Sequence, residues 1–149
     1  MSDYSVGIKD ILYAADIGNY AGSAPVSPAT VFEIHISRLP AEPNTAIAIL
    51  ETGGKEPNPK WLVDYPSIQI IVRGAPNGYA AGKQKATDVK DALLGFTSAD
   101  VNGDRWTCIN MLGDINNLGY DSNNCPMWSL NFSLVICPAA SSLTNRQPL

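Results

Sequence analysis

A glycine-bearing turn followed by Gly-Lys is the pattern in this chain that most suggests chemistry. Residues 65–86 read YPSIQIIVRGAPNGYAAGKQKA, in which an apolar run leads through a turn to Lys83 on an expected helix. A phosphate-binding loop needs Gly, four residues and then Gly-Lys-Ser/Thr, because backbone N–H groups surround the phosphates and the hydroxyl holds magnesium. Here Asn77 stands where the first glycine belongs, and Gln84 replaces the hydroxyl. The turn at 75–78 is therefore predicted only to join a strand to a helix.

Two other candidate sites fail for similar reasons. Residues 100–104, DVNGD, begin like a calcium loop, but glycine is fourth rather than sixth and Met111 stands where the twelfth-position glutamate belongs. Asn102-Gly103 is instead predicted to form a tight turn. His35 is the one histidine of the sequence, and no nucleophile is identified beside it. We therefore predict no catalytic, cofactor-binding or metal-binding residues, and no enzyme activity.

The composition is that of one ordinary globular domain. The chain has 149 residues, 45% apolar and 16% charged, with a formal net charge of −4. This acidic balance provides no attraction to nucleic acid or to an anionic membrane. The first residues lack a signal-peptide pattern, and no apolar run approaches the roughly 18 residues of a membrane helix. Cys108, Cys125 and Cys137 lack metal-type spacing, which favours reduced thiols in a cytoplasmic fold.

Two segments have helical periodicity. The first helix is expected over Tyr4–Tyr20, with Ser2 or Asp3 as its N-cap, and the second over Tyr79–Leu94. The inward faces are predicted to consist of Tyr4, Ile8, Ile11, Leu12 and Ala15 in the first helix and of Ala86, Val89 and Leu93 in the second.

Five segments have the pattern of strands. Val31–Ser37 and Met127–Cys137 alternate apolar with polar residues, and Ala46–Leu50 is apolar on both faces, as in a central strand. Another strand is marked by the apolar residues of 68–72, and Arg105–Leu112 is expected to place Trp106, Cys108 and Leu112 on one side. The element order predicts the α+β class: a mainly antiparallel or mixed β-sheet of about five strands with two helices packed on it.

Three stretches outside these elements are candidate contact surfaces. Residues 51–65, ETGGKEPNPKWLVDY, are expected to form a long loop with unusual apolar content. Residues 113–126 are too long for a tight hairpin and are expected to project. A polar tail at 138–149 follows a single domain at 1–137. The candidate interface residues in the three stretches are Trp61, Leu62, Val63, Tyr65, Leu118, Tyr120 and Arg146.

Five pieces of the chain occur in a suggestive order. They are Arg38-Leu39-Pro40, AIAILETGG, YPSIQIIVRG, the helix YAAGKQKATDVKDALLG and the closing segment GYDSNNCPMWSLNFSLVI. Together they resemble the small tail terminator proteins of long-tailed bacteriophages, over about residues 4–137. The chain departs from the family around Asn124 and Cys125, where a charged turn with glycine is expected.

The resemblance implies a structural role without covalent chemistry. Tail terminators form a hexameric ring on the last ring of tail tube subunits, stop its growth and offer the surface on which the head docks. The implied partners are further copies of this chain, the tail tube protein and a neck or head completion protein, with DNA only as passing cargo and no membrane. The implied location is the tail–neck junction of the virion, assembled in the bacterial host cytoplasm.

Two alternatives remain open at this point. The chain could be a head completion or neck protein of the same connector. It could also be a small ligand-binding domain or enzyme that uses a groove beside residues 52–65.

Overall fold

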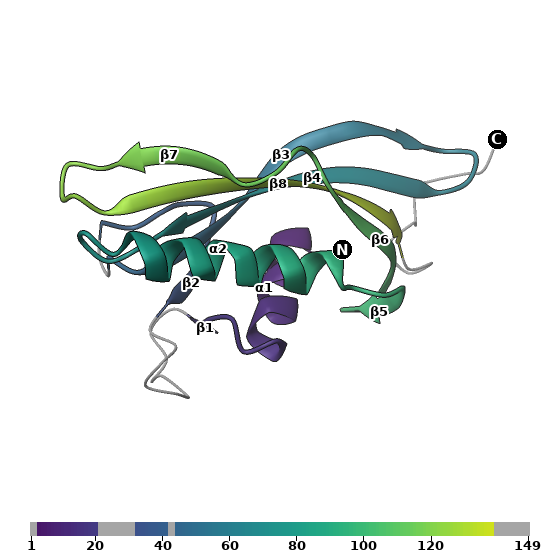
Figure 1. Ribbon diagram of the computed structural model, residues 1–149. Coiled ribbons are helices and arrows are strands. Elements are labelled where there is room, and N and C mark those ends of the chain that lie inside the picture. Colours follow the sequence, from purple (N-terminus) through teal and green to yellow (C-terminus); the bar gives the residue numbers. More distant parts are fainter. Residues whose placement is uncertain (1–2, 21–31, 42–43, 139–149) are drawn as a thin grey trace.

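The computed structural model describes residues 3–20, 32–41 and 44–138, and both helices lie on one face of a single sheet (Figure 1). Helix α1 spans Tyr4–Ala14 and helix α2 spans Tyr79–Leu94. This layering confirms the predicted α+β class with two helices packed on a sheet. The predicted tail lies outside the described residues beyond Pro138.

Helix α1 begins where the sequence predicts and ends earlier. The Asp3 side chain accepts a hydrogen bond from the backbone N–H of Ser5 at 2.9 Å, which makes it the N-cap. At the other end, Asp16 has a φ of 62°, and the N–H groups of Asp16 and Ile17 donate to the carbonyls of Tyr13 and Leu12. This is a Schellman motif, which closes the helix six residues before the predicted end.

Helix α2 has the predicted bounds, and it follows the predicted turn. The backbone N–H of Gly78 donates to the Ala75 carbonyl at 2.8 Å, and Asn77 has a φ of 59°. The predicted inward residues of this helix are fully buried: Ala86, Val89 and Leu93.

Each helix presents a glycine to a buried tryptophan of the sheet. A Cβ atom at Gly82 would collide with the ring of Trp128, and one at Gly7 would collide with the ring of Trp106. Both rings are 1% exposed, so neither has open space into which to move. The glycine of the Gly82-Lys83 pair is thus required for helix–sheet packing.

In the part of the chain that the structure describes, the sheet contains eight strands in the order β1-β2-β3-β4-β8-β6-β5, and β7 also pairs with β8. Pairing is parallel between β1 and β2 and between β2 and β3, and antiparallel elsewhere. The strands are β1 Asn19–Tyr20, β2 Glu33–Ile36, β3 Ala46–Asn58, β4 Val63–Arg73, β5 Ala99–Val101, β6 Asp104–Met111, β7 Asn116–Tyr120 and β8 Pro126–Cys137. The sheet is mixed and mainly antiparallel as predicted, with more strands than the five expected.

The core lies between the helices and one face of the sheet. Strand β3 is flanked by β2 and β4, and its residues Ala46–Ile49 are fully buried, as predicted for a central strand. Strand β8 confirms its alternation, since five residues at every second position are at most 1% exposed: Trp128, Leu130, Phe132, Leu134 and Ile136.

The stretch expected to be a loop at residues 51–65 is instead a β-hairpin. Strand β3 continues to Asn58 and pairs with the start of β4, with Gly54 opposite Pro66 and Lys55 opposite Tyr65. A register shift between Glu51 and Gly53 lets the ladder continue past the glycines. A segment with several glycines and prolines is usually a loop. Here the glycines lie at a β-bulge, and the proline of β3 lies on a strand edge that is unpaired among the described residues.

The stretch at 113–126 also contains a strand that was not predicted. Strand β7 pairs with the beginning of β8, with Asn116 opposite Ser129 and Tyr120 opposite Pro126. Strands β6 and β7 therefore lie one after the other along β8, and the tight turn is confined to residues 121–125.

The inward face predicted for Arg105–Leu112 is wrong beyond Trp106. A register shift between Trp106 and Cys108 places Ile109 in the core at 6% exposure, whereas Leu112 is 52% exposed. A bulge adds one residue to one strand, so the residues after it switch faces. The turn predicted at Asn102-Gly103 is confirmed, because both residues have positive φ between β5 and β6.

Arg73 secures the chain that connects the parallel strands β2 and β3. Arg73 is 5% exposed and pairs with Ala46 of β3. Its guanidinium donates hydrogen bonds to the carbonyls of Asn44 at 2.7 Å and Pro40 at 2.6 Å. Its neighbour Val72 faces the core, so Arg73 faces the opposite side of the sheet. The connection is thereby held against the sheet face that the helices leave free.

Candidate assembly interfaces

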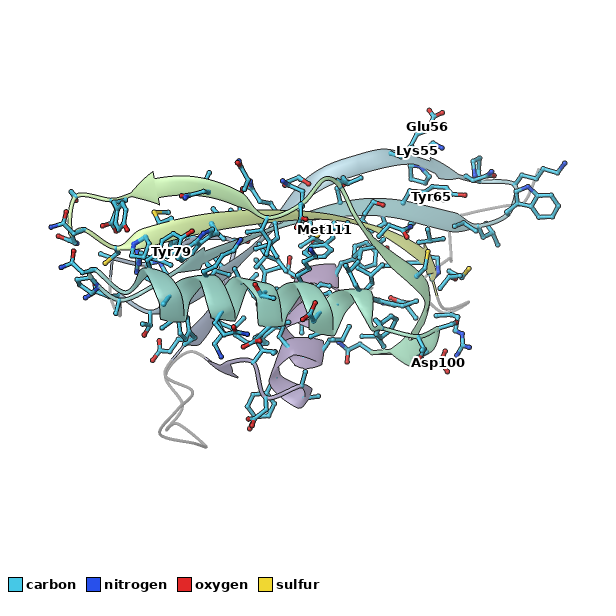
Figure 2. All side chains as sticks on the ribbon, in the orientation of Figure 1. Lys55, Glu56, Tyr65, Tyr79, Asp100 and Met111 are labelled. Carbon is cyan, nitrogen blue, oxygen red and sulfur yellow. The ribbon has the colours of Figure 1, made fainter. Side chains whose placement is uncertain are left out.

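The hairpin formed by residues 51–66, called here the β3–β4 arm, extends beyond the helices at one end of the sheet (Figure 1). Residues 51–57 are exposed throughout, and Lys55, Glu56 and Tyr65 lie on this hairpin (Figure 2). Strand β2 pairs with β3 only as far as Ile49, so the arm has no strand neighbour on that side within the described residues.

The base of the arm is attached to helix α1. The Tyr4 hydroxyl donates to the carboxylate of Asp64 at 2.8 Å, and Asp64 is 7% exposed. The Ser5 hydroxyl donates to Glu51 at 3.4 Å. Gly54 has a φ of 105°, and a Cβ atom there would collide with the Tyr65 carbonyl oxygen. The direction of the arm is therefore determined by the helix contacts and by this close approach of the strands.

The tip of the arm is an ordered turn that exposes a tryptophan. The Asn58 side chain accepts hydrogen bonds from the backbone N–H groups of Lys60 at 3.0 Å and Trp61 at 3.2 Å, and Leu62 has a φ of 55°. Trp61 is 67% exposed, the largest exposure among the large apolar side chains of the described residues. The Lys60 ammonium lies 5.1 Å from the centre of the Trp61 ring.

A second cation lies over a ring further down the arm. The Lys55 ammonium is 5.4 Å from the centre of the Tyr65 ring. These two side chains border a hollow of about 300 Å³ whose other walls include Ser67, Leu112 and Val135. Ser67 and Val135 alternate with core residues, so the hollow opens on the sheet face opposite the helices.

The second candidate surface is the β7 strip, defined as residues 116–121. Leu118 is 46% exposed and Tyr120 is 57% exposed. Strand β7 pairs only with β8 among the described strands, so its other edge is open. Figure 1 shows β7 and the β3–β4 arm at opposite ends of the sheet.

Backbone hydrogen bonds organise the turn that ends the β7 strip. The Asp121 carboxylate accepts from the N–H groups of Cys125 at 2.9 Å and Asn123 at 2.8 Å. The Cys125 bond, followed by the Asn123 bond, holds the pKa of Asp121 below its ordinary value. Asn124 has a φ of 60° and takes the conformation for which glycine was expected.

The carboxylate of Asp114 lies in the chain just before β7. Asp114 accepts a hydrogen bond from the Lys90 ammonium at 2.9 Å. This bond is the main reason that the pKa of Asp114 lies below its ordinary value. Asp114 and Asp121 thus remain ionised at the two ends of β7 at neutral pH.

The predicted interface residues fall into two separate groups. Trp61, Leu62, Val63 and Tyr65 all lie on the arm, and of these only Trp61 is mostly exposed, while the other three are partly buried. Leu118 and Tyr120 are exposed on the β7 strip, and Arg146 lies outside the described residues.

The sequence prediction missed several exposed apolar residues, of which Leu112 and Tyr79 are the most exposed. Leu112 was assigned to the inward face, and only the bulge in β6 reverses it. Tyr79 is 47% exposed at the start of α2, and its ring lies 5.5 Å from that of Trp128 (Figure 2). The sequence could have indicated that Tyr79 is exposed, because this residue lies outside the inward-facing stripe of α2.

Within residues 3–20, 32–41 and 44–138, no group of three or more His, Cys, Asp or Glu side chains is placed to hold a metal ion. In the same part of the chain, no helix is long and apolar enough to span a membrane.

Comparison with known proteins identifies the family. The profile of the bacteriophage tail terminator protein family matches residues 11–137. The chain therefore belongs to the bacteriophage tail terminator family, and it is a structural protein of the phage tail. No curated protein matches its sequence.

A solved structure has a similar fold. One chain in the virion of a native gene transfer agent particle aligns with a TM-score of 0.55 and 17% sequence identity. The alignment covers 89% of this chain and 92% of that chain, so the likeness extends over nearly the whole domain.

Proposed function

We propose that copies of this chain form a closed hexameric ring on the end of the tail tube. The ring stops tube polymerisation and provides the surface on which the head docks. Membership of the tail terminator family supports this role. The structural observation that carries the proposal is a pair of unlike, partly apolar surfaces at opposite ends of one sheet.

Two unlike surfaces favour head-to-tail association. Contacts of this kind produce a closed ring when the rotation between neighbours closes, and an open filament when it does not. Large exposed aromatic side chains such as Trp61 and Tyr120 are typical of the residues that contribute most to protein interfaces. The arm and the β7 strip therefore supply the two halves of a ring contact.

The proposed partners follow from the position of such a ring. One face of the ring contacts the tail tube protein and the other contacts the neck or head completion protein, at the tail–neck junction of virions assembled in the host cytoplasm. DNA passes through the ring only as cargo. The net charge of −4 suits this passage, because each phosphate contact made by a cation would add affinity for the DNA.

Electron microscopy of tail tubes assembled with and without the protein tests the proposal. We expect tubes of defined length with one additional ring at one end when the protein is present. A mass measurement of that ring should give six copies. Tubes of unchanged length with two bare ends would contradict the proposal, provided that the tube protein comes from the same phage. Finding the protein only in a ring on the head side would instead favour a neck protein.

Replacing Trp61 with Ala should weaken capping more than folding. The side chain is 67% exposed at the arm tip, so its loss removes contact area without opening a cavity in the core. Capping is measured as the fraction of tube ends that carry a ring, and folding by chemical denaturation. Leu94→Ala is a matched control, since Leu94 is 44% exposed on α2, away from both surfaces. Equal loss of stability and capping would contradict this assignment.

Removing residues 139–149 is expected to have the same selective effect. The described domain ends its core at β8, whose last buried residue is Ile136. We therefore expect the truncated chain to unfold at nearly the same denaturant concentration as the full chain, and to cap fewer tubes. Unfolding of the truncated chain would instead place the tail in the core.

A further inference from the structure

The exposed features of the two ends complement each other in chemistry as well as in position. The arm tip presents Lys60 over the ring of Trp61, and Lys55 lies over Tyr65 behind it. The β7 strip presents Leu118 and Tyr120, two large apolar side chains with open surroundings. The arm tip is thus a protruding aromatic side chain with a cation over its ring, and Lys60 and Trp61 together are called here the knob. The other surface is an apolar strip.

The segment that contains the strip carries carboxylates but no basic side chain, and of its two carboxylates Asp114 is already paired with Lys90 of α2. Between Arg105 and Arg146 the sequence contains no Lys or Arg, whereas Asp114 and Asp121 flank β7. Asp121 directly follows Tyr120, and its carboxylate has only backbone donors and the Cys125 thiol among its hydrogen-bonding neighbours. A lysine that approaches Tyr120 would therefore meet the Asp121 carboxylate, on which the buried Arg73 guanidinium also acts electrostatically.

The knob is held in shape before any contact forms. Asn58 fixes the turn through two backbone hydrogen bonds, and Pro57 and Pro59 restrict the backbone on either side of it. Binding through a preformed turn avoids the entropy cost of ordering a flexible loop. The prolines also lack N–H donors, so strand addition along the outer part of the arm is disfavoured relative to contact through side chains.

From these observations we propose that the Lys60–Trp61 tip of one copy seats on the Leu118–Tyr120 strip of the next copy, with Lys60 near Asp121. This contact specifies, residue by residue, the ring interface on which the proposed function rests. The occupant of the strip is a second copy of the chain because knob and strip occur on the same molecule at opposite ends of one sheet, and because Lys60 of the knob and Asp121 beside the strip have opposite charges.

A photoreactive benzoylphenylalanine at position 61 tests the contact in assembled rings. The variant is added to tail tubes of the same phage, irradiated, and its cross-linked peptides are identified by mass spectrometry. Mixing isotopically heavy and light copies separates links between copies from links within one copy. We expect links between copies, from position 61 to residues 113–127. Links to the tube protein, links to another surface of the chain, or rings without any link would each overturn the contact.

Complementary variants give an independent test. Trp61→Ala keeps an intact strip and Tyr120→Ala keeps an intact tip, so each alone should associate at least about tenfold more weakly than the wild type. An equal mixture has one intact contact for each unlike pair, and should form 1:1 pairs that neither variant forms alone. A closed ring is not expected, because every second contact in it would have both halves altered. Each variant alone, at the same total concentration, is the control, because no pair of its copies has both an intact tip and an intact strip. Equal association of the mixture and of the single variants would overturn the contact.

The outcomes for contact and function are distinguishable. A wild-type protein that caps tubes with a ring, but whose position 61 links elsewhere, retains the proposed function and loses this contact. A wild-type protein that leaves tube ends bare contradicts the proposed function itself.

Discussion

A methyl group added at Gly82 has no room, because the ring of buried Trp128 occupies the position that a Cβ atom would take. The ring cannot rotate away without disturbing the helix–sheet core. This residue therefore sets the distance between α2 and β8, and Gly7 does the same for α1 against Trp106. Small residues at these positions allow the two largest side chains of the core to lie under the helices.

Gly82→Ala should destabilise the fold by about 1–3 kcal/mol, the usual cost of adding atoms to a packed core. Chemical denaturation measures the change. Replacing Trp128 with Leu in the same chain should reduce the cost of the alanine, since the smaller side chain leaves room for the new methyl group. Strictly additive effects of the two substitutions would show that the helix–sheet distance is set elsewhere.

At this scale the sequence predicts core residues better than surface ones. The alternation in β8 and the helical stripe of α2 identify their buried residues correctly, because burial on one face imposes a period on the sequence. Leu112 is mispredicted because a single bulge in β6 shifts the alternation by one residue. Nothing in the residue types around Trp106 signals that shift.

Among the elements, the two hairpins at opposite ends of the sheet are stabilised in different ways. The β3–β4 arm depends on side-chain contacts at its base, where Tyr4 bonds to Asp64, and on Asn58 at its tip. The turn between β7 and β8 depends on Asp121, and it is also connected to the turn before α2, because the N–H of Asn77 donates to the Asn124 carbonyl at 2.9 Å.

Acid should loosen the β7–β8 turn at a pH below the ordinary carboxyl range. Bonds from the Cys125 and Asn123 N–H groups lower the pKa of Asp121 in the folded chain. A lowered folded pKa means that the stabilisation is complete above the unfolded pKa and is lost as the pH falls through the folded value. The amide proton shifts of Cys125 and Asn123, followed by NMR, should titrate below the ordinary value of about 3.9.

Asp121→Asn provides the comparison for this titration. The amide side chain can still accept hydrogen bonds but has no charge to lose in this range, so the two amide shifts should become independent of pH there. A titration of the wild-type shifts at or above the ordinary carboxyl pKa would contradict the role assigned to Asp121.

The elements themselves were predicted unevenly, for physical reasons. The predicted bounds of helix α2 are correct to the residue, because the turn before it, its helical period and Gly95 after it all indicate the same limits. The arm and β7 were missed because Gly, Pro and Asn are frequent in their sequences, and these residues usually indicate loops. Their strand structure comes from pairing with β4 and β8, and the residue pattern within one segment does not reveal that pairing.

The whole molecule is organised around β8. This strand pairs with β4 along one edge and with β6 and then β7 along the other, and it supplies five residues to the core. The parallel pairs β1–β2 and β2–β3 lie at the far side of the sheet. Strand order of this kind could not be obtained from the sequence, because alternation reveals which face is buried and not which strands are neighbours.

Hydrogen exchange should therefore be slowest in β8. We expect the amides of residues 132 and 133 to exchange only through global unfolding, because both residues pair with β4 on one side and with β6 on the other. Amides of residues 52–58 on the arm should exchange orders of magnitude faster, through local opening. Native-state exchange followed by NMR measures both. Similar rates in the two segments would contradict the central role of β8.

The place of β8 in the chain also governs how the protein is made. During synthesis, β4 and β6 both emerge from the ribosome before the strand that joins them. Until β8 follows, β4 has an unpaired edge and its apolar residues Ile68, Ile70 and Val72 lack their partners. Nascent chains in this state expose surfaces that chaperones bind and that aggregate when left free. Each subunit is thus obliged to complete its own sheet before it can contribute either of its ends to an assembly.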